Sequence, residues 1–270
     1  MDKAHEHTDS ILHATEHKIN RIYGAARREI RKEVASQIED IYLDDEDATH
    51  RERLEYAENH GVEEVLIGTV AILLLANQNA QAVTNRAVQH IYVLNYSYTA
   101  DVVFGAVSVD IGKRGKPLLD SIQSRYDKRA YEKATDRSQQ LTSVRRAIQG
   151  AIKHGKSIQD IARQIMSITN QNRNRALTIA RTETTRTENR GRFDAMGQAQ
   201  KMGVTIKKRW MATHDSRTRD SHVWVDGEIR ELKDVFSNGL EFPGDPNGPA
   251  EEVCNCRCTI VSEIEVENEG

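Results

Sequence analysis

The chain has 270 residues, of which 38% are hydrophobic, 29% are charged and 5% are aromatic. This length allows one or two domains with a substantial core, and the balance of apolar and charged residues excludes a chain that is disordered throughout. The net charge is −3, and all 3 cysteines lie between residues 254 and 258, which excludes a disulfide framework and suits a reducing compartment.

The small net charge hides a strong segregation along the chain. Residues 113–210 contain 23 Lys and Arg against 8 Asp and Glu, a net charge of +15, whereas residues 1–60, 61–112 and 211–270 carry −6, −3 and −9. This asymmetry predicts a polyanionic or acidic partner for the central segment, with a solvated basic helical face as the alternative. Aromatic residues barely interleave with the charges, so stacking on single-stranded bases is not expected.

The N-terminal part of the chain has helical patterning. Apolar residues recur at helical spacing over residues 8–42, which predicts a long amphipathic helix, and a second helix is expected over 63–90. Its most apolar run, residues 65–76, is shorter than the roughly 20 residues that span a bilayer, so it predicts a buried core helix and no membrane partner. The first ten residues lack the pattern of a secretory signal, which favours the cytoplasm.

Further helices are expected in the middle of the chain, over residues 117–134, 141–154, 158–166 and 171–201. Residues 91–112 are rich in Tyr and Val, and we favour helix and loop there over strand. Ser157 and Asp160 have the spacing of a capping box, and Gly155 and Gly203 have the chemistry of helix C-caps.

After Gly203 the pattern changes from helix to strand and turn. Strands are predicted over residues 206–212 and 256–264, separated by a turn into a helical piece at 213–222, a tight turn at Asp226-Gly227 and a rigid loop at 243–249. We therefore expect an α+β protein, with a predominantly helical region over residues 1–156. A compact C-terminal α+β domain with an acidic tail is expected over residues 157–270.

The alternating cysteines raise the question of a metal site. On a straight strand their side chains would share one face about 6.6 Å apart, so a turn at Asn255 would be required for them to converge. Tetrahedral zinc accepts thiolate and imidazole, which makes His222 and His214 candidate partners. The chain has neither a CxxC nor an HxxxH pair, so small buried thiols are the preferred interpretation. The candidate metal ligands are His222, Cys254, Cys256 and Cys258.

One enzymatic interpretation, a metal-dependent nuclease, is the alternative to a structural protein, and a second, an ADP-ribosyltransferase, is discounted. The candidate residues for a metal-dependent nuclease are His214, Asp215, Asp220 and His222. Two-metal hydrolysis needs several carboxylates around ions about 4 Å apart, whereas Asp215 fits equally well as a helix N-cap. Residues 180–188 contain the Arg, Thr and Glu elements of ADP-ribosyltransferases, but in one helix instead of on separate strands. Glu183 is expected instead to anchor the helix to Trp210 or Arg217, because an unpaired buried carboxylate is costly.

Four segments taken in order resemble the phage Mu F-like minor head protein family, whose members are also called phage head morphogenesis proteins. They are ALTIARTETTRTENRGR, KRWMATHDSRTRDSH, VDGE and FPGDPNGPAEEVCNCRC, within residues 175–260. The resemblance implies a virion component of the capsid interior, assembled in the bacterial host cytoplasm, and it implies no settled catalytic activity; we expect a structural protein and not an enzyme. The resemblance also implies the portal protein, capsid or scaffold proteins and non-specific double-stranded DNA as partners. The motif residues are Arg181, Glu183, Trp210, Asp215, Arg217, Asp226 and Gly227.

The resemblance also bears on the metal site, because some members carry a CxxC pair and a closing His-Pro-Asn-Cys-Arg-Cys that resemble a zinc site. Here Arg219 and His222 stand at the first pair, and Val253 replaces the closing histidine. No cofactor is therefore expected, with zinc as the metal that the remaining residues could accept. Within the basic segment, the candidate DNA contacts are Arg173, Arg175, Arg186, Arg190, Lys207 and Lys208.

Overall fold

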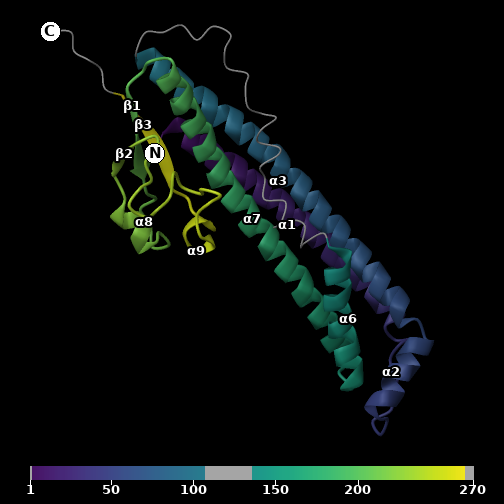
Figure 1. Cartoon of the computed structure of the whole chain (residues 1–270). Helices are drawn as coiled ribbons and strands as arrows, with labels where there is room; N and C mark the ends of the chain where they lie inside the picture. The colour runs from purple at the N-terminus through teal and green to yellow at the C-terminus, as the bar shows by residue number, and fades with distance from the viewer. Residues whose placement is uncertain (1, 107–135, 265–270) are drawn as a thin grey trace, which may run out of the picture. The chain divides into compact units, whose positions relative to one another are not determined.

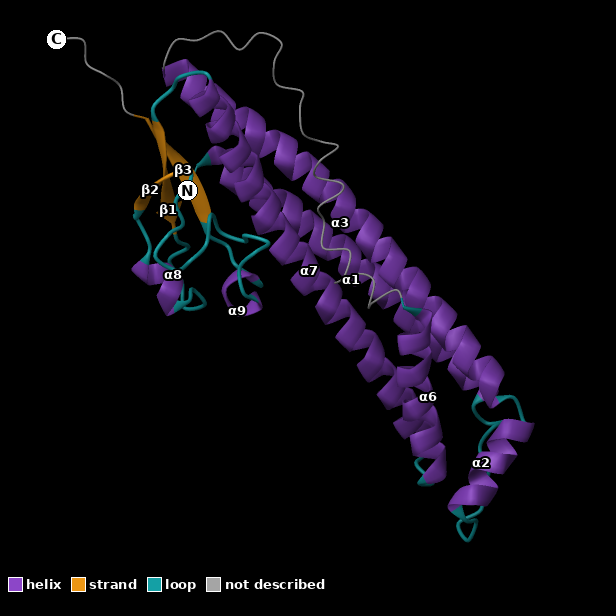
Figure 2. Cartoon of the chain, in the orientation of Figure 1, coloured by secondary structure: helices purple, strands orange, loops and turns teal. Residues whose placement is uncertain are grey.

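The computed structural model describes residues 2–106 and 136–264 (Figure 1). Its long helices are α1 (Lys3–Gln37), α2 (His50–Asn59), α3 (Val62–Ala106), α6 (Arg137–Lys153) and α7 (Ile158–Lys201). The C-terminal part adds β1 (Ile206–Met211), α8 (Asp220–Trp224), β2 (Ile229–Glu231), α9 (Ala250–Val253) and β3 (Thr259–Ile264). Figure 2 shows a small sheet beside long helices, so the expected α+β class is confirmed.

The described chain divides into two compact units. Unit 1 comprises residues 2–16, 84–106 and 178–264, and unit 2 comprises residues 17–83 and 136–177. Helices α1, α3 and α7 each supply residues to both units, so the boundary expected after residue 156 does not separate them. The physical reason is length: a helix of 44 residues such as α7 is about 66 Å long, more than one small core can cover.

The helix ends follow the capping chemistry of the sequence. The Ser157 hydroxyl accepts the Asp160 N–H at 3.2 Å and donates to the Asp160 carboxylate at 2.8 Å, which confirms Ser157 as the N-cap of α7. Gly155 and Gly203 have φ values of 59° and 93°, as C-terminal caps require. The expected break between residues 166 and 171 was wrong, because no Gly or Pro interrupts α7 there.

Two helices differ from expectation. Helix α3 continues to Ala106, so most of the Tyr- and Val-rich segment is helical. Helix α2 was missed, although Thr49 and Glu52 form a capping box at its start. The helix expected over residues 117–134 lies outside the described residues.

Helix α3 has 45 residues and extends well beyond the apolar run at residues 65–76 from which a buried core helix was predicted. Within the part of the chain that the structure describes, it is the one helix that length and composition would allow to cross a membrane. Of its most apolar stretch, 44% is buried inside the molecule, and a buried core helix meets the same criteria.

Unit 2 is a helical unit with an aliphatic core. Its fully buried side chains include Ile30, Leu66, Leu73 and Ile148. Polar pairs fix the packing inside this unit: Gln140 and Asn172 exchange two side-chain hydrogen bonds at 3.3 and 3.2 Å, one in each direction. Buried amides held in this way specify one arrangement of the helices, since any other would leave them unpaired.

Unit 1 contains an antiparallel sheet with strand order β2-β1-β3. Trp210, opposite Ile260 in the register, is fully buried and is the largest such side chain in the core. Two long helices also meet in this unit. A Cβ atom on Gly191 of α7 would lie 2.8 Å from the carbonyl oxygen of Tyr92 on α3, so only glycine permits this approach.

Candidate functional site

The motif-bearing part of α7 binds the backbone of the chain that leads into β3. Thr182 accepts the N–H of Asn255 at 3.1 Å, and Thr185 donates to the carbonyl of Cys256. Asn189 donates to the carbonyl of Cys258 at 3.1 Å and accepts the N–H of Ile260 at 2.8 Å. Since β3 pairs with β1 on its other side, these polar side chains occupy what would otherwise be a free sheet edge.

The chain turns at Asn255, between Cys254 and the other two cysteines. Asn255 is the one described non-glycine residue with positive φ, at 55°, a conformation that Asn tolerates better than most residues. Cys256 and Cys258, which follow this turn in the sequence, are buried in the core of unit 1, whereas Cys254, which precedes it, is partly exposed. The expectation of three converging thiols was therefore wrong for Cys254, because the turn separates it from the other two.

His222 and two thiols form the only group of potential metal ligands found among the described residues. The ligand atoms of His222, Cys256 and Cys258 all lie within 4.8 Å of one another. His222 Nδ1 lies 3.6 Å from the sulfur of Cys256 and 3.3 Å from that of Cys258. Three of the four candidate ligands named from the sequence therefore lie together.

The other nitrogen of His222 has a carboxylate partner. Its Nε2 lies 3.0 Å from Oε2 of Glu252 on α9, and this carboxylate also accepts the hydroxyl of Ser221 at 2.9 Å. The imidazole packs edge-on to Trp210, with ring centroids 5.2 Å apart. The Glu252 carboxylate, the Trp210 ring and the two thiols that precede β3 thus hold the imidazole with Nδ1 directed at the two sulfurs.

The two thiols differ in acidity. Cys256 donates a hydrogen bond that lowers the pKa of the Cys258 thiol, and His222 adds to this effect against the opposing influence of burial. The same hydrogen bond and burial raise the pKa of Cys256.

The side chains of His222, Cys256 and Cys258 are of the types that bind zinc. Two thiolates and one imidazole nitrogen are ordinary zinc ligands, and a histidine ligand commonly has its second nitrogen on a carboxylate, as His222 has on Glu252. Zinc usually takes four ligands. Among the described residues, no fourth His, Cys, Asp or Glu lies within the same 4.8 Å group.

The residues expected for a nuclease do not converge. His214 is exposed and pairs with Asp226 at 3.2 Å, and Asp220 stands at the exposed start of α8. Asp215 closes a turn by accepting the N–H of Arg217 at 2.9 Å and is not a helix N-cap, since α8 begins five residues later. No pair of carboxylates is gathered for metal-dependent hydrolysis in this segment of the described chain.

The remaining motif residues have structural contacts. Gly227 has φ of 77° and donates its N–H to the carbonyl of Trp210 at 2.9 Å, which confirms the tight turn. Asp226 accepts the N–H of Ala212 at 2.7 Å. These two residues join β1 to the segment that leads into β2.

Glu183 anchors α7 to a different segment from the one expected. Its carboxylate accepts from Arg186 at 2.7 Å, and Arg186 in turn donates to the carbonyl of Gly244 at 3.0 Å. Neither Trp210 nor Arg217 is the anchor, because the 243–249 loop lies directly against this part of the helix: a Cβ on Gly244 would lie 2.9 Å from the Arg186 backbone.

The candidate DNA contacts are divided between the two units and differ in availability. Arg173 and Arg175 belong to unit 2, and the other four belong to unit 1. Arg186 is partly buried in its contact with Glu183, Arg190 pairs with Asp194 at 2.8 Å, and Lys207 lies 3.6 Å from Glu231.

The expectation that Lys208 contacts DNA was wrong, because its side chain is fully buried. Its ammonium donates to the carbonyls of Leu232 and Glu241 at 3.1 and 2.9 Å and lies over the rings of Phe193 and Phe236. Burial lowers the pKa of Lys208 to about 8.

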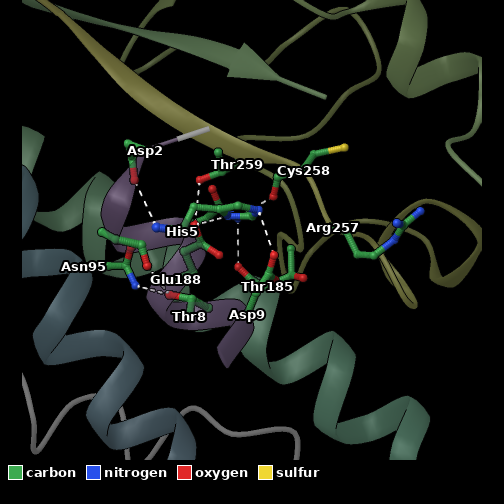
Figure 3. Close-up of polar contacts among 12 residues, drawn as sticks. Asp2, His5, Thr8, Asp9, Asn95, Thr185, Glu188, Arg257, Cys258 and Thr259 are labelled. Atoms are coloured by element: carbon green, nitrogen blue, oxygen red, sulfur yellow. Dashed lines mark hydrogen bonds and ion pairs between the residues drawn. The ribbon is translucent and has the colours of Figure 1, made fainter. Parts of the chain in front are cut away.

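A buried ionic cluster that the sequence did not predict joins the start of α1 to α7 (Figure 3). His5 Nδ1 lies 2.7 Å from the carboxylate of Glu188, and Thr259 of β3 donates to the same carboxylate at 3.0 Å. Arg192 binds Asp2 through two hydrogen bonds at 2.6 and 2.8 Å. No local pattern signals these pairs, which join residues more than 180 positions apart.

Comparison with known proteins gives a family for the C-terminal part. Residues 142–261 match the family described as Phage Mu protein F like protein. The Minor head protein GP7 of Bacillus phage SPP1 is 22% identical over 99% of this chain and 88% of its own length. No solved structure matches the chain.

Other relatives share only a portion of their length with this chain. An NAD(+)--arginine ADP-ribosyltransferase EFV of Enterococcus faecalis is 34% identical over 52% of the chain, and the match spans 29% of that protein. A Haemophilus influenzae protein is 34% identical over 46% of the chain and 25% of its own length. The shared part corresponds to a module that occurs in longer proteins.

Proposed function

Because the chain belongs to the phage Mu protein F-like family of head morphogenesis proteins, we propose that it is a minor head protein that binds the portal and contacts DNA inside the capsid. The observation that carries this proposal is the nearly end-to-end similarity to the Minor head protein GP7 of phage SPP1. A virion location follows from the family, and we infer the capsid interior after assembly in the host cytoplasm.

Contact with DNA is supported by charge. The +15 of residues 113–210 would neutralise phosphates without reading bases, which makes binding independent of sequence and steeply dependent on salt. The exposed Arg175 and the partly exposed Arg173 are the candidate residues least occupied by acidic partners. Filter binding of the full chain to random duplex DNA over a salt series tests this. Absence of binding at low salt would remove DNA as a direct partner.

Contact with the portal, and with capsid or scaffold proteins, is proposed from the acidic parts of the chain. Residues 1–60 and 211–270 carry −6 and −9, which suits docking on basic protein surfaces. Co-expression with the portal protein from the same phage genome, followed by co-purification, tests the contact. A complex that forms at low salt and dissociates at high salt is expected, and failure to co-purify at low salt would contradict it.

We also propose that His222, Cys256 and Cys258 bind a structural zinc ion. The support is that Glu252 orients the imidazole and that all three donor atoms lie within 4.8 Å of one another. Zinc at this place would tie α8 to the approach to β3 and would contribute its binding energy to folding.

An enzymatic role has less support. The nuclease alternative lacks a gathered set of carboxylates among the described residues, and the ADP-ribosyltransferase relative is matched over 29% of its length only. The Arg, Thr and Glu residues of segment 180–188 lie on α7. Incubation of the purified chain with plasmid and Mg²⁺, Mn²⁺ or Zn²⁺ tests the alternative. Cleavage that His222→Ala abolishes would favour an enzyme over a structural protein.

A further inference from the structure

Unit 1 contains a cavity of about 480 Å³ in which arginines predominate. Four segments of the chain contribute to it: α1, α7, the loop between β1 and α8, and the turn between α9 and β3. We call it the arginine cavity, and its charged lining residues are Glu16, Arg181, Arg217, Arg219 and Arg257. None of these arginines was among the DNA contacts expected from the sequence, because they are brought together only by the fold.

Three of the four guanidinium groups are held in position. Arg257 is bound by both carboxylate oxygens of Asp215, and Arg219 donates to the carbonyl of Cys254. Arg181 pairs with Glu16 of α1. These contacts fix the guanidinium groups before any ligand arrives, so that little side-chain entropy is lost on binding.

The fourth arginine is nearly free. The side chain of Arg217 is 76% exposed, and its guanidinium is 3.5 Å from Asp215, which Arg257 already binds at closer range. Four arginines thus line the cavity against three carboxylates, Glu16, Asp215 and, through its charge on Arg257, Asp9, so arginines still outnumber carboxylates around it. An unmatched excess of arginine in a formed cavity attracts an anion that accepts several hydrogen bonds at once.

We propose that the arginine cavity binds a phosphate group, and that a backbone phosphate of DNA supplies it in the head. The guanidinium fork matches the oxygens of phosphate, and a cavity of this size is large enough for a phosphodiester with its neighbouring sugars. The identity of the phosphate donor rests on the proposed function, whereas the cavity and its chemistry do not. The bound phosphate replaces water beside Arg217 and takes hydrogen bonds that Asp215 leaves unused.

Two substitutions, one at an arginine and one at a carboxylate, should change the affinity for phosphate in opposite directions. Arg217→Ala removes the guanidinium with the fewest internal contacts, so it should weaken binding of pyrophosphate by about tenfold or more. Asp215→Asn keeps the shape of the side chain and its acceptor for the turn, but removes the charge that competes for Arg257 and Arg217. It should therefore tighten binding, which loss of structure would not do. Arg163→Ala, on an exposed arginine outside the cavity, is the matched control.

The experiment measures pyrophosphate binding to the full chain by calorimetry, for the wild type and these three variants. Alkylation of Cys254 gives a second measurement, because this thiol lines the cavity and is more exposed than the buried Cys256 and Cys258. Pyrophosphate should slow the alkylation of Cys254, as quantified by peptide mass spectrometry. Absence of pyrophosphate binding to the wild type, or equal affinities in Arg217→Ala and Arg163→Ala, would overturn the proposal.

A parallel titration with duplex DNA separates the source of the phosphate from the existence of the cavity site. Weaker DNA binding in Arg217→Ala than in Arg163→Ala supports DNA as the ligand. Pyrophosphate binding without DNA binding retains the cavity site and overturns both DNA as its ligand and the proposed DNA contact. DNA binding that is equal in the two variants, without any pyrophosphate binding, overturns the cavity site and leaves the proposed function intact.

Discussion

Asn189 of α7 holds Ile260 of β3 in the way that a neighbouring strand would, accepting its N–H at 2.8 Å. The amide group of the same side chain donates to the carbonyl of Cys258 at 3.1 Å. Asn189→Ala should leave both backbone groups buried without partners and lower the free energy of unfolding by about 2–4 kcal/mol. Denaturant unfolding measures this.

The control for this substitution is Gln200→Ala, at an exposed position of the same helix. It should change the free energy of unfolding by less than about 0.5 kcal/mol. Equal effects of the two variants would mean that α7 does not hold the outer edge of β3.

Two glycines of α7 should respond to alanine with opposite signs. A Cβ on Gly191 would lie 2.8 Å from the Tyr92 carbonyl, so Gly191→Ala should destabilise by about 1–3 kcal/mol. A Cβ on Gly197 meets nothing within 4 Å, so Gly197→Ala should stabilise by up to about 1 kcal/mol through helix propensity. Thermal and denaturant unfolding of both variants check the pair, and a stabilising Gly191→Ala would contradict the close approach of α3 and α7.

The buried ionic cluster should make stability depend on pH. Burial lowers the pKa of His5, but the hydrogen bond and charge of Glu188, with a smaller contribution from Asp9, outweigh it and raise this pKa above 6.5 despite the opposing charge of Arg192. His5 therefore stabilises the fold fully below pH 6.5, and the contribution is lost as pH rises through the folded pKa.

The measurement is the free energy of unfolding between about pH 5.5 and 8.5, for the wild type and for His5→Gln. The wild type should lose stability with rising pH across this window, whereas the variant, which has no titrating imidazole at residue 5, should show a flatter profile. Identical profiles would exclude His5 as the origin of the dependence.

The proposed zinc site predicts different outcomes for two neighbouring cysteines. Cys256→Ser should lower the zinc content and the melting temperature, whereas Cys254→Ser should leave the zinc content unchanged, since Cys254 is outside the group of His222, Cys256 and Cys258. Glu252→Gln should weaken zinc binding by roughly 10- to 100-fold through the orientation of His222.

Elemental analysis of protein purified without added metal decides whether the site exists. About one zinc per chain, and a lower melting temperature after chelation, are expected. Protein that contains no zinc and melts at the same temperature with or without chelator would show that the thiols only pack.

Local chemistry made part of the fold predictable. The capping residue Ser157, the helix-ending Gly203 and the turn at Gly227 act through their immediate neighbours, and each performs the role that its sequence context predicts. The linked motifs made His222, Cys256 and Cys258 candidate ligands, and these three side chains meet in the fold. Short-range steric and hydrogen-bonding rules were sufficient for the caps and the turn at Gly227.

Long-range arrangement was not predictable in the same way. Lys208 occupies a buried position of β1, in phase with Ile206 and Trp210, yet its charge suggested a surface residue. The carbonyls of Leu232 and Glu241 accept from its ammonium and explain its burial. The pairing of His5 with Glu188 depends on how helices pack, which no local pattern encodes. For the same reason Arg217 and Arg181 could not be assigned to one cavity from the sequence.

The central claim, that the chain is a minor head protein, is tested most directly by quantitative mass spectrometry of purified heads from the phage that encodes it. The chain should be present in DNA-filled heads and in procapsids, in fewer copies than the major capsid protein. Its absence from both particles, in a lysate that contains the intact chain, would contradict the account.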